Sequence, residues 1–252
     1  MGKWFERLFS GMGMEVLISD VGTSLSSTRL AEICPVVIIA VPMSVFPDVV
    51  REVGPCMKKD AFLTDICSLK EKQVKCMMEN TECAVAGTHP LFGPGEPGLE
   101  GKRVAICPGR GDKWVDWWEN LLMEQGALCV RFTPHEHDRT MSWVQALNHF
   151  ILMCLGKSLK DDGMDFRHIM HLATPSFERQ MDILGRLCMQ DPELYATIQM
   201  ENPYTEKALQ TFIDHGNQLN DIIKSGDRDE FLSIFREVQE LGPDILQYCR
   251  NR

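Results

Sequence analysis

MGKWFERLFSGMGMEVLISD, residues 1–20, joins a helical pattern to a glycine-rich turn, a short apolar run and an acidic residue. Between Lys3 and Ser10 the apolar side chains recur at helical spacing, at Trp4, Phe5, Leu8 and Phe9. Val16–Ile18 then predicts a strand that leads to Asp20. Helix, turn, strand and acid in this order are typical of the second half of a dinucleotide-binding unit. The first half of such a unit, a strand and a glycine loop, is not in the sequence.

Short apolar runs and helical patterns continue to alternate up to residue 133. The runs are rich in Val, Ile, Phe and Cys, which is typical of strands buried on both faces of a parallel sheet. The predicted strands are EVLISD, VVIIAVP, AFLTDIC, CAVAGTHP, RVAICPG and LCVRFTP. The clearest helical pattern between them begins at Asp112, with an apolar stripe at Trp114, Trp117, Leu121 and Leu122. This alternation predicts a Rossmann-like, doubly wound parallel sheet that lacks its first strand.

The sequence changes character after residue 133. Residues 134–252 carry long helical patterns without a strand-like run, and several of these patterns begin at Thr-Pro, Asp-Pro or Asn-Pro pairs. Residues 139–159 are apolar around most of a helical circumference, which predicts a buried central helix. We therefore expect an α/β domain over residues 1–133 and an all-helical domain over residues 134–252.

The composition excludes several classes of partner. A net charge of −10 and a pI near 5.2 argue against nucleic acid and against a polybasic membrane patch. The longest apolar run is too short to span a bilayer, and the first residues lack the apolar core of a signal peptide. The 10 cysteines form no C-x-x-C pair, which favours reduced thiols. We expect a cytoplasmic protein.

Three side chains fall at the ends of predicted strands, where open parallel sheets bind ligands. Asp20 is placed to accept hydrogen bonds from the adenosine ribose of NAD, or is a solvent-exposed or helix-capping aspartate. Ser68 either begins a helix as its N-cap or, with Lys70, faces the cofactor cleft. His89 is followed by a proline-stiffened loop, so its imidazole is either structural or placed for proton transfer.

Other candidate groups leave more than one interpretation open. Residues 135–138, HEHD, resemble metal ligands but have no third-ligand pattern after them, so we predict no metal. His149 lies within the predicted buried helix and is either a core histidine or a pocket residue. Arg179 and Arg186 lie two helical turns apart and would bind an acidic substrate or form surface ion pairs.

Four segments, DICSLK, GTHPLFGPG, EHDRTMSWVQALNHF and GRLCMQDPELYATI, together resemble the prephenate dehydrogenase family. The resemblance runs over nearly the whole chain in the same order. It is greatest to the dehydrogenase part of the bifunctional chorismate mutase–prephenate dehydrogenases, the T-proteins. The resemblance implies NAD-dependent oxidative decarboxylation of prephenate to 4-hydroxyphenylpyruvate in tyrosine biosynthesis. It also implies that the helical domain forms a homodimer and supplies much of the substrate pocket.

The resemblance also implies roles for individual residues. His89 would be the catalytic base and Ser68 its hydrogen-bond partner, whereas Arg186 would hold a substrate carboxylate. His149 matches a pocket histidine linked to prephenate or to tyrosine, a possible feedback inhibitor. The cofactor-binding residues would be Gly2, Asp20, Val41, Pro42 and Ser68.

The sequence departs from the family pattern at its start and at one arginine. The match begins at the last glycine of the nucleotide motif, Gly2, and no mutase-like segment comes before it. We therefore expect that Met1 is not the biological start or that the chain is a fragment, with weak NAD binding and low stability. Arg179 is offset by one position from the family's other helix arginine. Two alternatives stay open, an arogenate dehydrogenase and a non-catalytic dimer that binds aromatic acids and has lost its cofactor site.

Overall fold

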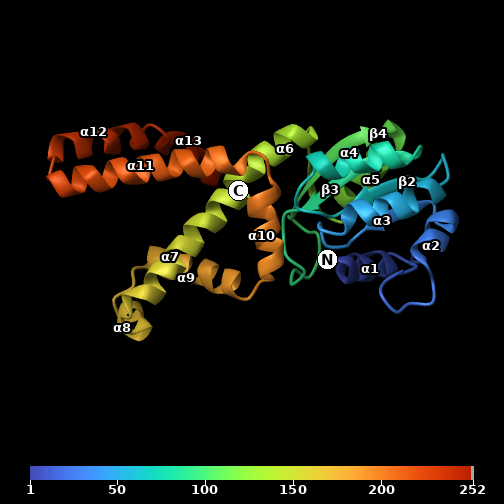
Figure 1. Cartoon of the computed structure of the whole chain (residues 1–252), viewed down its shortest axis with the longest axis horizontal. Helices are drawn as coiled ribbons and strands as arrows, with labels where there is room; N and C mark the ends of the chain where they lie inside the picture. Colours follow the sequence, from blue (N-terminus) through green and yellow to red (C-terminus); the bar gives the residue numbers. More distant parts are fainter. Residues whose placement is uncertain (251–252) are drawn as a thin grey trace. The chain divides into compact units, whose positions relative to one another are not determined.

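The computed structural model describes residues 1–250 and divides into two compact units (Figure 1). The first unit is Met1–Thr205 and the second begins at Glu206. The domain boundary predicted between residues 133 and 134 stays a prediction.

The first unit is built on a sheet that, over the described residues, has five strands in the order β1-β2-β3-β4-β5. The strands are β1 (Val36–Ile39), β2 (Phe62–Asp65), β3 (Ala84–Pro90), β4 (Arg103–Arg110) and β5 (Leu128–Arg131). Every neighbouring pair is parallel except β3 and β4. A predominantly parallel sheet with helices, followed by a helical region, confirms the predicted fold class.

The antiparallel pairing of β3 with β4 corrects the prediction of an all-parallel sheet. A parallel connection needs a crossover, usually a helix, to carry the chain back to the starting edge. The connection over residues 91–102 contains several glycines and no helix, so the chain returns directly beside β3. β5 then runs parallel to β4 and is mostly exposed at the edge, although its sequence predicted burial on both faces.

The strand predicted at Val16–Ile18 is absent from the described structure. Residues 14–20 have no regular secondary structure and pair with no strand, and the side chains of Leu17 and Ile18 are exposed. A strand needs a neighbour to satisfy its backbone N–H and C=O groups, and β1 pairs only with β2. β1 therefore lies at the edge of the sheet, and its residues alternate between half-buried and buried.

Helices cover both faces of the sheet, as a doubly wound fold requires. One face packs against α1 (Gly2–Gly11) and α5 (Asp112–Glu124), with Trp4, Phe5 and Trp118 in its core. The other face packs against α2 (Ser27–Ile33), α3 (Phe46–Val53) and α4 (Glu71–Asn80). The predicted stripe of α5 is shifted, because Val115 and Trp118 are buried and Trp117 is exposed.

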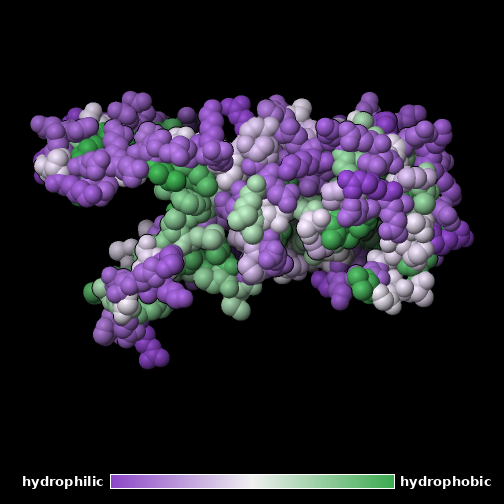
Figure 2. Space-filling view, viewed as in Figure 1, coloured by the Kyte–Doolittle hydropathy of each residue, from purple (hydrophilic) through white to green (hydrophobic). Residues whose placement is uncertain are grey.

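A run of helices follows the sheet in the first unit. It consists of α6 (Pro134–Met141), a π-helix η2 (Ser142–Leu147), α7 (Asn148–Asp162), α8 (Phe166–His171), α9 (Pro175–Cys188) and α10 (Pro192–Glu201). The helix predicted to be buried over residues 139–159 is buried only in its first part in the described chain. Met141, Ala146 and Leu147 are buried, whereas Leu152 is the one buried residue of α7. Met153 is 51% exposed, and apolar residues gather over α7 on the face drawn in Figure 2. Helix α9 packs along α7, around Leu152, Met181 and Leu184.

The second unit consists of α11 (Thr205–Ser225), α12 (Arg228–Gln239) and α13 (Gly242–Arg250). It also leaves large apolar side chains exposed, at Phe231, Phe235, Val238, Leu241, Ile245 and Leu246. Among the described residues, no helix is both long enough and apolar enough to cross a membrane.

Candidate active site

The carboxyl ends of β1, β2 and β3 meet at one edge of the sheet because these strands are parallel. Val41 and Pro42 follow β1, Ser68 follows β2, and His89 is the penultimate residue of β3. The fold therefore brings four of the residues singled out in the sequence to the same edge.

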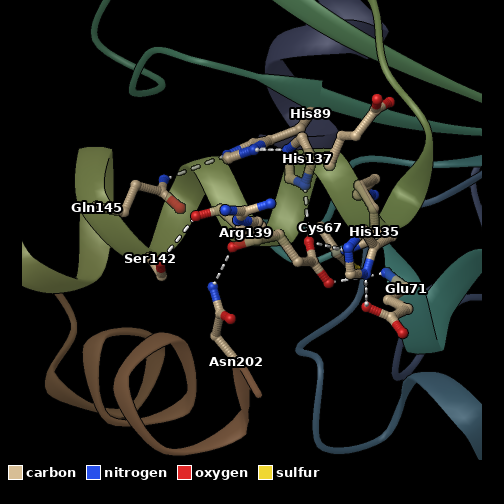
Figure 3. Close-up of polar contacts among 12 residues, drawn as sticks. Cys67, Glu71, His89, His135, His137, Arg139, Ser142, Gln145 and Asn202 are labelled. Carbon is tan, nitrogen blue, oxygen red and sulfur yellow. Dashed lines mark hydrogen bonds and ion pairs between the residues drawn. The ribbon is translucent and has the colours of Figure 1, made fainter. Parts of the chain in front are cut away.

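His89 is buried, with 3% of its surface exposed, and both of its ring nitrogens have partners. Its Nδ1 lies 2.9 Å from Nε2 of His137 on α6. Its Nε2 lies 3.3 Å from Nε2 of Gln145, an amide nitrogen that can only donate. Figure 3 shows the three side chains in line, with the His89 ring between the other two.

The adjacent residue Asp138 extends this line of contacts. Its Oδ1 lies 2.7 Å from Nδ1 of His137. The two carboxylate oxygens also accept the backbone N–H groups of Lys70 and Glu71, each at 2.8 Å, at the start of α4. A carboxylate is favoured at a helix N-terminus because the unpaired N–H groups there carry partial positive charge. We refer to His89, His137 and Asp138 as the histidine chain.

A buried ion pair lies next to the histidine chain, because the backbone N–H of one of its members, Lys70, donates to Asp138. The Lys70 ammonium and the Asp65 carboxylate are both fully buried and paired, and Lys70 Nζ also donates to the backbone oxygen of Thr88 at 2.9 Å. Asp65 in turn accepts the backbone N–H of Cys67 at 2.9 Å. Lys70 therefore does not face a cofactor cleft, which corrects the expectation from the sequence.

The surroundings of His89 hold its imidazole in the neutral form. Burial lowers the pKa of His89 well below its usual value, and the neighbouring His137 and Lys70 lower it further. Burial also lowers the pKa of His137, although the hydrogen bond to Asp138 acts in the opposite direction. Near neutral pH His89 is therefore unprotonated and can accept a proton.

Ser68 does not occupy the N-cap position, which was one of the two places that its sequence position predicted. Helix α4 begins at Glu71, with Lys70 at the capping position, so Ser68 is not the N-cap. Asp138, from a distant part of the chain, satisfies the first N–H groups of that helix instead. Among the described contacts His89 bonds to His137 and Gln145, and the half-buried Ser68 bonds to neither.

His149 and Gln145 lie four residues apart on the continuous helical run of η2 and α7. The buried Nδ1 of His149 and the buried Oε1 of Gln145 have no hydrogen-bond partner in the described structure. The His149 ring packs on Tyr195 of α10, with ring centroids 4.3 Å apart. Buried polar atoms without partners are costly, so these two atoms are suited to a polar ligand.

Arg186 is exposed near the C-terminal end of α9. Its described contacts do not reach His89, and Arg179 on the same helix is also exposed. The structure of the single chain therefore does not bring the predicted carboxylate-binding arginine to the predicted base.

The expected cofactor residues are placed as follows. A Cβ built on Gly2 would lie 3.1 Å from Cβ of Ala40, so the N-terminus of α1 approaches the end of β1 closely. Asp20 is exposed in a turn, where its Oδ1 accepts the backbone N–H of Val21 at 2.7 Å. Val41 and Pro42 follow the same end of β1.

Sequence reasoning missed four residues of this site: Lys70 as a buried cation, His137, Asp138 and Gln145. The HEHD segment resembles metal ligands in sequence, but the described residues contain no group of three or more His, Cys, Asp or Glu that could hold a metal ion. A usable signal was the order of residues, since Thr133-Pro134 begins a helix with a capping box and places His137 and Asp138 in its second turn. Their partners, on β3 and at the start of α4, are distant in the sequence and could not be found from spacing.

Comparison with known families gives the identity of the fold. A model described as "Prephenate dehydrogenase, nucleotide-binding domain" matches residues 13–131, and one described as "Prephenate dehydrogenase, dimerization domain" matches residues 133–237. The chain belongs to the prephenate dehydrogenase family. The resemblance seen in the sequence is thereby confirmed.

Individual relatives agree with this assignment. A protein of Methanocaldococcus jannaschii named "Probable arogenate/prephenate dehydrogenase" is 34% identical, over 94% of this chain and 58% of its own length. A T-protein of Enterobacter agglomerans is 28% identical, over 95% of this chain and 64% of its own length. The chain thus spans about three fifths of the length of these curated relatives.

A solved structure shows the same fold. The prephenate dehydrogenase of Aquifex aeolicus in complex with hydroxyphenyl propionate and NAD⁺ superimposes with a TM-score of 0.69 at 21% identity. The match covers 88% of this chain and 80% of that one.

Proposed function

We propose that the protein catalyses the NAD-dependent oxidative decarboxylation of prephenate to 4-hydroxyphenylpyruvate. The observation that carries the proposal is the buried, neutral His89, whose Nε2 has only an amide donor as its partner. Family membership indicates the class of reaction. The position of His89, at the carboxyl ends of the parallel strands, indicates where the reaction would take place.

The role of His89 is to hold and return a proton. As the C4 hydrogen of prephenate leaves as hydride, Nε2 of His89 accepts the hydroxyl proton. Loss of the ring carboxylate as carbon dioxide makes the ring aromatic, and His89 returns the proton to the phenolate oxygen. The Gln145 amide, which now donates to Nε2, marks the position where the substrate hydroxyl would donate instead.

Bound NAD would supply the hydride acceptor. The residues at the carboxyl edge fit such a cofactor, because the close approach of Gly2 to Ala40 puts a helix N-terminus beside the end of β1. Gly2, Val41, Pro42 and Ser68 would hold the dinucleotide, and Asp20 would accept hydrogen bonds from its ribose.

The helical part of the chain would hold the substrate. The unpartnered Nδ1 of His149 and Oε1 of Gln145 supply polar groups, and Arg186 would bind a carboxylate.

The exposed apolar faces of α7 and of the second unit support a homodimer, which would cover them. Light scattering of the purified chain measures its molar mass in solution, and we expect the mass of a dimer.

The test is a steady-state assay of the purified full chain with NAD and prephenate, following the absorbance of NADH and the phenolic product. We expect turnover that requires both reactants and releases carbon dioxide in equal amount. Failure to bind NAD in a calorimetric titration would instead favour a non-catalytic dimer that binds aromatic acids.

The same chemistry on the amino analogue, arogenate, is the second candidate. The name of the Methanocaldococcus jannaschii relative includes both substrates. Comparing kcat/KM for prephenate and for arogenate under identical conditions decides between the two, with the higher value expected for prephenate.

A further inference from the structure

The two side chains behind His89 form a buried, directional hydrogen-bond chain. His137 and Asp138 are each 1% exposed, so water does not compete for their contacts. Asp138 Oδ1 contacts Nδ1 of His137 at 2.7 Å, and Nε2 of His137 contacts Nδ1 of His89 at 2.9 Å. Neither residue has a part in the proton transfer proposed for His89 itself.

The direction of the chain is set at its Asp138 end. Both carboxylate oxygens of Asp138 accept backbone N–H groups at the start of α4, and an ionised carboxylate has no proton to donate. His137 must therefore donate from Nδ1. Because a neutral imidazole carries one ring proton, Nε2 of His137 is then an acceptor.

The same rule fixes the proton of His89. Its Nδ1 must donate to Nε2 of His137, so its Nε2 is left with a lone pair. The contact at that nitrogen agrees, because the Gln145 amide nitrogen beside it can only donate. The other tautomer would place an N–H of His89 against a donor at Nε2.

We propose that His137 and Asp138 are positioning residues that hold His89 in the tautomer whose Nε2 can accept the substrate proton. The proposal rests on the proposed role of His89 as the base. After His89 accepts the proton, its Nδ1–H still donates to His137, and the Asp138 carboxylate at the far end of the chain opposes the new positive charge.

Nitrogen NMR of the full chain labelled at histidine reads the tautomers without any reaction. In the wild type near neutral pH we expect the proton on Nδ1 of both His89 and His137. Signals are assigned by their loss in His89→Gln and in His137→Gln. A wild-type spectrum with the His89 proton on Nε2 would overturn the proposal.

Asp138→Asn tests the effect on turnover. When the amide nitrogen of Asn replaces Oδ1, it donates to Nδ1 of His137 and gives up the hydrogen bond from the Lys70 N–H. The His137 proton then moves to Nε2 and the His89 proton to its own Nε2. In a Ser-His-Asp triad the same exchange lowers kcat by about 10⁴-fold, and we expect about 10²- to 10⁴-fold here. KM for prephenate and the Kd for NAD should change less than about threefold, because Asp138 does not contact either ligand.

His137 gives a matched pair of variants. His137→Gln keeps a carbonyl that accepts from His89 and an amide that donates to Asp138, whereas His137→Met removes both hydrogen bonds at similar size. We expect kcat within about tenfold of wild type for Gln and a loss of about 10²-fold or more for Met. His135→Gln, an exposed histidine two residues away, is the control and should have wild-type kcat.

The outcomes separate this proposal from the proposed function. Equal kcat in His137→Met and wild type would overturn the positioning role while leaving the dehydrogenase activity established. If the wild type has no activity with either substrate, the proposed function fails. The NMR spectrum still tests whether His137 and Asp138 hold the His89 proton on Nδ1.

Discussion

Replacing His89 with Ala removes the imidazole that would receive the substrate proton. We expect kcat to fall by about 10²- to 10⁴-fold, the usual range for a positioned acid–base group, with little change in the Kd for prephenate. In wild type the acidic limb of kcat/KM should fall below pH 6.5, because burial lowers the pKa of His89 from that value. The variant should lack this limb, and near-normal turnover in steady-state assays would contradict the assignment.

Arg186→Ala removes a guanidinium that would bind a carboxylate of prephenate. The expected loss of prephenate binding is about 1.5 to 3 kcal/mol, the range for a charged hydrogen bond, with NAD affinity unchanged. Arg179→Ala, on the same helix and also exposed, is the matched control. Titration calorimetry with each ligand measures both constants. If the variant instead lost NAD binding and kept prephenate binding, Arg186 would belong to the cofactor site and our assignment would be wrong.

At the scale of elements, the close packing of β3 on α4 depends on Gly87. A Cβ at this position would lie 2.7 Å from Val74 Cγ2 and 2.8 Å from Lys70 Cδ, so Gly87→Ala has to displace the buried ion pair. We expect a loss of about 1 to 3 kcal/mol in the free energy of unfolding, as is usual for overpacking. Urea unfolding measures it, with Gly98→Ala as the control because nothing lies within 4 Å of that Cβ. An equal free energy of unfolding in Gly87→Ala and in wild type would show that β3 and α4 can move apart without loss of stability.

The sequence predicted elements well where their pattern was local. The apolar face of α1 and five of the strand positions follow from periodicity, because burial of alternating or clustered apolar residues is a property of each segment. Val16–Ile18 has the same apolar composition and forms no strand, because pairing depends on a neighbour that a local pattern does not contain. The antiparallel β4 could have been inferred from the helix-free connection before it.

At the scale of the whole molecule, the buried histidines make stability depend on pH. The pKa values of His89, His137 and His149 are all lowered, so the unfolded chain binds more protons than the folded one once the pH falls below about 6.5. Stability is therefore full above that pH and decreases as the pH falls from there toward the folded-state pKa values. We expect Tm to fall between about pH 7 and pH 5 and to fall less in a His89→Gln/His137→Gln double variant. An increase of Tm on acidification would contradict the burial of these rings as neutral groups.

The candidate site was only partly predictable because its residues come from distant parts of the chain. His89 was predicted from its position at the end of a strand and from the family resemblance. Both can be obtained from the amino-acid sequence alone. The bond from His89 to His137 joins residues on β3 and α6, and Asp138 caps a helix that begins 67 residues earlier. Such contacts arise when the sheet and α6 pack together, and single-sequence patterns do not record them.

The edge position of β1 has a consequence for solvent exchange and for association. The carbonyl groups of Pro35 and Ile39 accept the N–H groups of Phe62, the first residue of β2, and of Ile66, just after β2. Backbone groups alternate in direction along a strand, so those of Val36 and Ile38 point to the open side. Deuterium should therefore replace the amide hydrogens of Val36 and Ile38 much faster than those of Val37 and Ile39. The same open row, in an apolar and β-branched segment, is a template on which another extended chain could add as a new strand.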